Sequence, residues 1–276
     1  MKKSLTSLAT IALVAASSLS QAQTPASAAP AAAPEPADSL TYNMGAVTDY
    51  RYRGISQSKK TGALQAGVDF VSASGFYVGA WGSQITWIKD TDPTLSTLKG
   101  KYEIDIYGGY KKEIAKDTIL DVGVLQYWYK GNTLTKVIGA VNANTTEVYG
   151  AVSYGPITVK LSDSVTPLFG MANTSGSRYL DISYTIDMGD GLTIVPHAGD
   201  QYVKHTKGVA APSYSDFSLT VNKDINGLVI YGTVIGTNFK RLHGNDFGGN
   251  PGYTLPGSGA KNLADTALVV GIKKNF

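Results

Sequence analysis

The sequence predicts an all-β fold, a transmembrane antiparallel up-and-down β-barrel of about 12 strands with both termini on the periplasmic side. Three observations support this prediction. Apolar and polar residues alternate with a period of two in one segment after another, the connections between these segments are alternately short and long, and the last segment ends the chain on an aromatic residue, Phe276.

The final segment, 265–276, shows the alternation most simply. One face carries Thr266, Leu268, Val270, Ile272 and the terminal Phe276, and the other carries Ala267, Val269, Gly271, Lys273 and Asn275. Residues two apart point in nearly opposite directions on a helix, so this pattern requires a strand. In outer-membrane barrels the last strand pairs with the first and its aromatic lies at the membrane interface. We therefore expect this strand, ending in Phe276, to engage the barrel-assembly machinery; an edge strand of a soluble sandwich is the alternative.

The first residues indicate export. Lys2 and Lys3 precede a short apolar run, and a small-x-small cleavage site ends at Ala22. The sequence thus predicts a signal peptide over 1–22, a flexible Ala/Pro-rich periplasmic segment over 23–39, and an outer-membrane barrel over 40–276. The apolar run is too short to span a bilayer as an anchor.

Composition narrows the possible functions. The 276-residue chain has no cysteine, which excludes disulfides, thiolate metal sites and cysteine nucleophiles. After residue 22 no apolar run is long enough for a transmembrane helix. Glycine (31) and tyrosine (17) are abundant and mean hydropathy is near neutral, as expected of a barrel whose apolar residues alternate with polar ones.

The first half of the barrel is expected to contain the strands 42–53, 64–70, 76–87, 102–111, 120–129 and 146–154. The fourth is the clearest, with Tyr102, Ile104 and Ile106 alternating with Glu103 and Asp105. In the first strand, one face carries Tyr42, Met44, Ala46, Tyr50 and Tyr52, and the other, polar face carries Asn43, Asp49, Arg51 and Arg53. The far end of the third strand, near Trp87, is irregular.

The second half is expected to contain the strands 157–161, 179–187, 192–201, 216–221, 228–239 and 265–276. Pro196 is awkward in the third of these, because proline removes one donor from the hydrogen-bond ladder. In 228–239 both faces are apolar, so the pattern leaves open which one points inward.

The connections separate the two ends of the barrel. The short turns are 72–75, 113–117, 155–156, 188–191 and 223–227, and the long polar loops are 54–62, 89–101, 130–144, 163–177, 204–213 and 240–264. Short periplasmic turns alternating with long outer loops are typical of transmembrane barrels. A soluble barrel would need an apolar interior, and about twelve strands enclose too wide a space for aliphatic side chains to fill.

One stretch carries a family resemblance. Thr48-Asp49-Tyr50-Arg51-Tyr52-Arg53-Gly54-Ile55-Ser56-Gln57 resembles the opening motif of the TorF family of bacterial outer-membrane porins, a Gcw_chp-like family. The likeness continues through 63–65 and 75–83 and, more weakly, through 103–110, 121–129, 147–150, 197–199 and 214–216. Gly62 and Lys130 depart from it, both at loop edges. The resemblance implies a porin without naming a substrate.

The polar faces of the strands supply candidate pore-lining residues. These are Asp49, Arg51, Arg53, Asp69, Glu103, Asp105, Lys111, Asp121, Tyr127, Glu147, Asp181, His197 and Asp216. Acids outnumber bases among them, so a channel with this interior would mildly prefer cations or neutral polar solutes. The alternative is that these groups pair across strands and neutralise one another. Inward tyrosines could likewise guide solutes or merely narrow the lumen.

No enzyme site emerges from the pattern. His197 is the only histidine in an expected strand, and Ser183 and Asp181 could complete a catalytic set, but lumen-facing groups cannot reach a lipid ester. Histidine and acid spacings suggest no metal or cofactor. The function expected is passive diffusion of small polar solutes or ions through a porin-like channel; a structural or adhesive barrel with a lumen plugged by side chains is the alternative.

The long loops are rich in lysine, which bears on partners. The basic residues there are Lys59, Lys60, Lys89, Lys99, Lys101, Lys130, Lys136, Lys204, Lys207, Lys240 and Arg241. Contact with outer-membrane lipid and the phosphates of lipopolysaccharide is one interpretation, and a solvated rim is the other. No nucleic-acid partner is expected.

Overall fold

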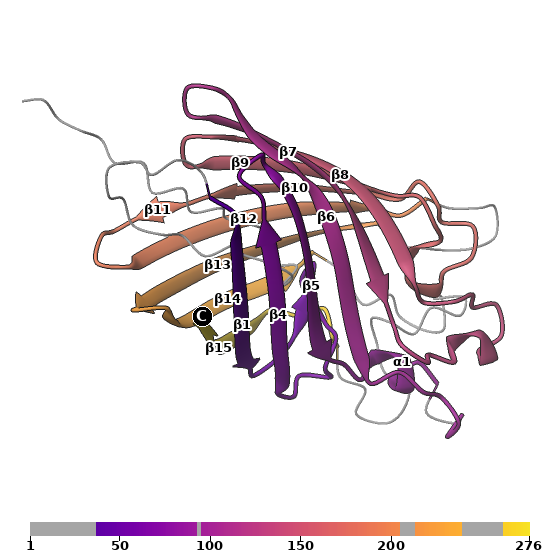
Figure 1. Cartoon of the computed structure of the whole chain (residues 1–276). Coiled ribbons are helices and arrows are strands. Elements are labelled where there is room, and N and C mark those ends of the chain that lie inside the picture. Colours follow the sequence, from indigo (N-terminus) through magenta and orange to yellow (C-terminus); the bar gives the residue numbers. More distant parts are fainter. Residues whose placement is uncertain (1–36, 93–94, 205–212, 239–261) are drawn as a thin grey trace, which may run out of the picture.

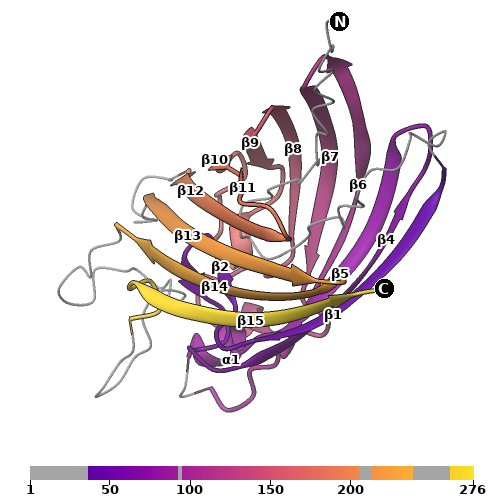
Figure 2. The same ribbon diagram turned by 90° about the vertical axis from the view of Figure 1, so that its left-hand side faces the viewer.

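The described part of the chain closes into an antiparallel β-barrel. A computed structural model describes residues 37–92, 95–204, 213–238 and 262–276, and Figure 1 shows their strands wrapped around one interior. In chain order the wall strands are β1 (Ser39–Val47), β4 (Ala63–Val71), β5 (Phe76–Gln84), β6 (Tyr102–Ala115), β7 (Thr118–Trp128), β8 (Thr145–Tyr154), β9 (Ile157–Ser164), β10 (Arg178–Tyr184) with β11 (Ile186–Asp187), β12 (Leu192–Tyr202), β13 (Tyr214–Ile225), β14 (Leu228–Thr237) and β15 (Ala267–Asn275). Each pairs with its sequence neighbour, and β1 pairs with β15 to close the ring (Figure 2).

The barrel has twelve strands in the described residues, as the sequence predicts. β10 and β11 both pair with β12 in one continuous register and form a single strand interrupted at Thr185. In this register Pro196 of β12 lies opposite Tyr184, next to the interruption, between the pairs Ser183–His197 and Ile186–Ile194. Proline has no N–H to donate at that point, which explains the gap in the ladder.

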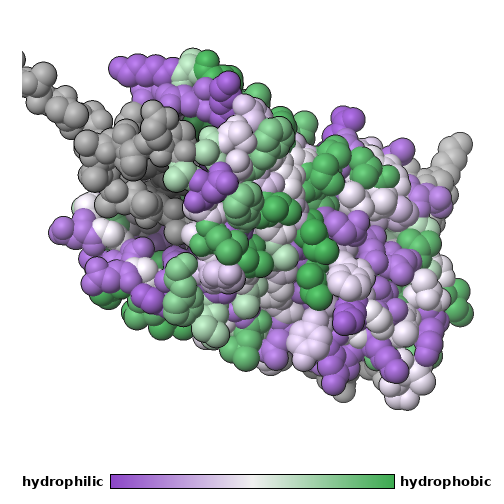
Figure 3. Space-filling view, in the orientation of Figure 1, coloured by the Kyte–Doolittle hydropathy of each residue, from purple (hydrophilic) through white to green (hydrophobic). Residues whose placement is uncertain are grey.

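The wall is apolar outside and polar inside. On β6 the outward Tyr102 and Ile106 are 54% and 46% exposed, whereas the inward Glu103 and Asp105 are 1% and 0% exposed. The same alternation holds around the ring, so the outside carries a broad band of aliphatic and aromatic side chains (Figure 3). The expected faces of β6 and β15 are thereby confirmed.

The structure settles the two stretches whose pattern was irregular or ambiguous, the end of the strand near Trp87 and the inward face of 228–239. β5 ends at Gln84 instead of continuing to Trp87, because the chain there forms a short helix, α1 (Trp87–Asp90). In β14 the inward side chains include Thr233 and Ile235, while Ile230 and Val234 are exposed outside. No helix among the described residues is long and apolar enough to cross a bilayer.

Tyrosines pack on glycines across the inner wall. Tyr107 of β6 lies over Gly79 of β5, and Tyr77 of β5 lies over Gly109 of β6. The pairs Tyr149–Gly123 and Tyr231–Gly271 repeat the arrangement on β8–β7 and β14–β15. A Cβ atom on any of these glycines would collide with the ring, so each ring fills the space that its glycine partner leaves.

The expectation that the first strand runs to residue 53 is wrong. β1 ends at Val47, and the chain then turns into the barrel as a small hairpin of β2 (Arg51–Tyr52) and β3 (Ile55–Ser56). Figure 2 shows β2 within the ring of strands. Residues 48–58 are hereafter the inner hairpin.

Candidate functional site: the constriction inside the barrel

The inner hairpin is built on a tight two-residue turn. Its central residues Arg53 and Gly54 both have positive φ, 46° and 81°, the combination that a type I′ turn requires. Gly54 also has no room for a side chain, because a Cβ would lie 2.5 Å from Thr237 Cγ2 and 2.9 Å from Asp216 Cβ. The turn is therefore seated directly against β13 and the end of β14.

Arg53 anchors the hairpin to the far wall. Its Nη2 donates to both oxygens of Glu147 on β8, at 2.8 and 3.0 Å, and its Nη1 donates to Gln201 Oε1 on β12 at 2.6 Å. The guanidinium carbon also lies 4.6 Å and 4.1 Å from the ring centres of Tyr52 and Tyr179. Burial alone would lower the pKa of Arg53, but the Glu147 carboxylate holds it well above its usual value, so the group stays charged.

Arg51 holds the hairpin together from within. It donates to Asp49 Oδ2 at 2.7 Å, to the Gly54 carbonyl at 3.0 Å and to the Asp265 carbonyl at 2.6 Å. Asp49 in turn accepts a 2.5 Å bond from the Ser56 hydroxyl. Three candidate pore residues, Asp49, Arg51 and Arg53, thus lie on the inner hairpin and not on the wall.

Tyr50 and Tyr52 point into the barrel, contrary to the expectation that they share the outward face of the first strand. The Tyr50 hydroxyl donates to Glu103 on β6, and its ring packs edge-on against Trp81, with centroids 5.5 Å apart. Burial and then the nearby Glu103 charge raise the pKa of Tyr50 well above its usual value, so the hydroxyl remains a donor. The hairpin is therefore tied to β6 through Tyr50 and to β8 and β12 through Arg53.

Asp105 is an exception in this polar interior. It is fully buried on β6 between its cross-strand neighbours Trp81 and Tyr127. Neither of its carboxylate oxygens has a hydrogen-bond partner among the described residues, and no ion pair there includes Asp105 or Glu103. Burial without a partner disfavours the ionised form of this carboxyl group.

A second polar cluster lines the wall at β10, β12 and β13. His197 Nε2 lies 2.8 Å from Asp181 Oδ2 and its Nδ1 lies 3.7 Å from Asp216 Oδ1, while Tyr179 donates to Asp216 at 3.0 Å. Ser183 is a cross-strand neighbour of His197. A general base must face the hydroxyl that it activates, but here Nε2 faces an aspartate. The imidazole thus lies between two acids.

The interior is less crowded toward the short turns. There Asp69, Lys111 and Asp121 are only half-buried. Tyr77 donates to Asp121 at 2.6 Å, Tyr107 bonds Asp69, and Lys160 Nζ lies 4.0 Å from the ring centre of Tyr149. The inner hairpin thus narrows the long-loop half of the barrel, while the inward side chains of the short-turn half are more exposed.

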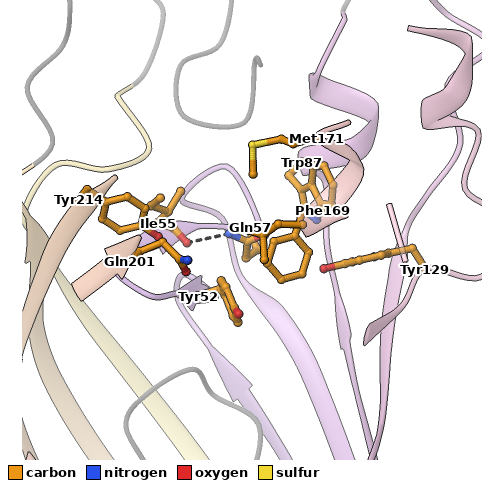
Figure 4. A pocket seen from close by; sticks show the side chains of 10 residues that line it. Tyr52, Ile55, Gln57, Trp87, Tyr129, Phe169, Met171, Gln201 and Tyr214 are labelled. Carbon is orange, nitrogen blue, oxygen red and sulfur yellow. Dashed lines mark hydrogen bonds between the residues drawn. The ribbon is translucent and has the colours of Figure 1, made fainter. Parts of the chain in front are cut away.

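A pocket opens above the inner hairpin. It is a half-open hollow, with about 540 Å³ of empty space when the part open to solvent is included. It is lined by Tyr52, Ile55, Gln57, Trp87, Tyr129, Leu168, Phe169, Met171, Gln201 and Tyr214 (Figure 4). Phe169 belongs to the loop after β9 and takes a left-handed conformation, with φ 46°, that places its ring against Tyr52, Tyr127 and Tyr129 at 5.1, 5.1 and 6.4 Å. Alternation could not reveal Phe169, since it lies outside the strands.

The lysine-rich loops are only partly described. Lys59 lies 3.5 Å from Asp90, and Lys60 lies 2.6 Å from Asp265, so both basic groups have acidic partners. Lys207, Lys240, Arg241 and the stretch 248–259 fall outside the described residues. Within the described ranges, no cluster of three or more His, Cys, Asp or Glu side chains could hold a metal ion.

Known structures share the barrel fold. The NanC porin superposes with a TM-score of 0.50 at 8% identity, over 86% of this chain and 99% of that one. An outer-membrane channel from Pseudomonas putida F1 gives 0.43 at 11% (89% and 97% covered), and outer membrane phospholipase A from Escherichia coli gives 0.43 at 12% (85% and 91%). At such identities the likeness concerns the fold alone.

The sequence itself matches a bacterial family. No curated protein matches the chain. The family described as "Bacterial protein of unknown function (Gcw_chp)" matches residues 31–276, which include the whole barrel and the inner hairpin. The TorF name remains a prediction. With a porin-like transmembrane β-barrel and this match over nearly its whole length, the chain belongs to the Gcw_chp family.

Proposed function

We propose that this protein is a narrow channel of the Gram-negative outer membrane, through which small polar solutes or ions diffuse passively. One observation carries the proposal. The interior is polar and charged along its height and holds a hairpin seated across it, whereas the outside is a band of apolar side chains. Lipid can solvate only the outside, and water or hydrated solutes fit only the inside.

The charge of the interior supports a mild preference for cations. Arg53 and Arg51 are matched by Glu147 and Asp49, and acids outnumber bases among the other inward side chains, which include Asp69, Asp121, Asp181 and Asp216. Unmatched acids beside a narrow path raise the local concentration of cations, more so at low salt. We place the short turns and both termini in the periplasm, as in other barrels with this loop pattern.

The near-complete burial of the inner hairpin favours a second candidate, a structural or adhesive barrel whose lumen is plugged. Planar-bilayer recording separates the two. The backbone N–H of Gln57 donates to the Tyr50 carbonyl at 2.7 Å, so residues 51–56 can be replaced by a two-residue Asn-Gly turn without moving the flanking chain. Heat-modifiable gel mobility would verify that each protein has folded.

A channel predicts small single-channel steps for the unaltered protein and larger steps for the trimmed one. Steps in the trimmed protein alone would make the hairpin a permanent plug and would favour the structural barrel. If neither folded protein produced steps, the channel proposal would be wrong.

A further inference from the structure

The pocket above the inner hairpin is built from parts of the chain that lie far apart in sequence. Three elements far apart in sequence build it: α1 supplies Trp87, the loop after β9 supplies Phe169 and Met171, and the inner hairpin supplies Ile55 and Gln57. Figure 4 shows Trp87, Phe169 and Met171 on one side, Tyr214, Ile55 and Gln201 on the other, and Gln57 between them.

The pocket lining has few polar groups that are free to bind a ligand. No charged side chain of the described chain lines the pocket, and Arg53 lies beyond Tyr52 with its charge matched by Glu147. Gln201 Nε2 already donates to the carbonyls of Arg178 and Tyr202. Trp87 Nε1, in contrast, is buried and has no acceptor among the described residues.

The backbone of Phe169 is held in a costly conformation. A non-glycine residue at φ 46° and ψ 47° is strained by about 1–3 kcal/mol, and such strain persists where the surroundings enforce it, often at ligand sites. Here the strain places an aromatic ring beside Trp87 and Tyr129, which themselves pack edge-on with centroids 5.3 Å apart.

We infer that this pocket is a binding site for a small uncharged aromatic molecule bearing a hydrogen-bond acceptor, which the indole N–H of Trp87 would satisfy. Ring-lined walls of Trp87, Tyr129 and Phe169 suit a flat apolar ligand, because aromatic pairs gain from edge-on and offset contacts. A sugar fits less well, since it would need many free polar partners and the glutamine amides are mostly engaged. The inference deepens the proposed function by naming a solute class for the mouth of the channel.

Calorimetric titration of the refolded full-length protein in detergent tests the inference without requiring conduction. The probe is benzamide, a neutral aromatic ring with a carbonyl acceptor, and glucose is the comparison. Trp87→Phe keeps an aromatic side chain, although a smaller one, and removes the N–H, and should weaken benzamide binding about three- to tenfold. The matched control is Trp128→Phe, which alters an outward residue of β7 and should leave the affinity unchanged.

The expected result is saturable benzamide binding that weakens in Trp87→Phe only. Absence of benzamide binding, tighter binding of glucose, or equal affinities in both variants would overturn the inference. Failure of the channel proposal looks different: benzamide would still bind in detergent while no single-channel steps appear in a bilayer.

Discussion

The ion pair between Arg53 and Glu147 should dominate the stability of the inner hairpin. Both side chains are only 3% exposed, and two hydrogen bonds join them. Arg53→Met would leave the Glu147 carboxylate buried without its partner, which costs about 3–5 kcal/mol of unfolding free energy. The lower end is the better expectation, because Tyr127 still offers its hydroxyl to Glu147 at 3.4 Å.

The double variant Arg53→Met/Glu147→Leu shows how much of the lost unfolding free energy comes from the unpaired charge of Glu147. With both charges gone and apolar groups of similar size in their place, the unfolding free energy should recover by about 2 kcal/mol or more relative to Arg53→Met. Urea unfolding in lipid vesicles, followed by tryptophan fluorescence, measures each value.

An exposed ion pair provides the matched control. Arg178 lies 2.8 Å from Asp163, but these side chains are 63% and 32% exposed. Arg178→Met should therefore change the unfolding free energy by less than about 1 kcal/mol. If the double variant were as unstable as the sum of its two single changes, the two charges would not be coupled, and the reasoning about the hairpin anchor would fail.

Three further predictions concern the turn, the unpaired acid and the chain end. Gly54→Ala should weaken the contact of the inner hairpin with Thr237 and Asp216, and so enlarge the single-channel conductance. Gly62→Ala, where a Cβ would meet no atom closer than 3.5 Å, should change neither the contact nor the conductance. Asp105→Asn should raise the temperature of the heat-modifiable gel transition, because it replaces a buried carboxyl group that has no hydrogen-bond partner among the described residues with a group that cannot ionise. A reversal potential in a salt gradient that moved toward zero would show that Asp105 carries charge, and an unchanged potential would show that it does not set selectivity. Deleting Phe276 should lower the amount of folded protein in outer-membrane fractions while leaving the conductance of the folded fraction intact, and normal assembly would contradict a role in the assembly signal.

Much of the barrel wall could be predicted from sequence, because each strand has apolar residues on its outward face and polar residues on its inward face, at alternate positions. Glu103 and Asp105 lie inside and Tyr102 and Ile106 outside, as their parity requires. The pairing of β1 with β15 follows from the same pattern together with the loop lengths.

The inner hairpin could not be predicted this way. Polar and aromatic residues alternate from Asp49 through Arg53, but there both parities are buried, so the period of two carries no information about direction. One local signal was available: Arg53-Gly54 between Tyr52 and Ile55 fits a two-residue turn, although asparagine is the usual residue before the glycine. The long-range bonds from Arg53 to Glu147 and Gln201 depend on the closed ring and leave no local trace in sequence.

The tyrosine–glycine pairs have a consequence for the width of the barrel. Inside–outside alternation is equally satisfied if two neighbouring strands slide by two residues, so it leaves several diameters open. Such a slide would move Tyr107 off Gly79, or Tyr231 off Gly271, onto a residue whose side chain occupies the same space. Each pair therefore permits only one register between its two strands. Together the pairs fix the stagger of the strands, and with it their tilt and the inner diameter of the barrel.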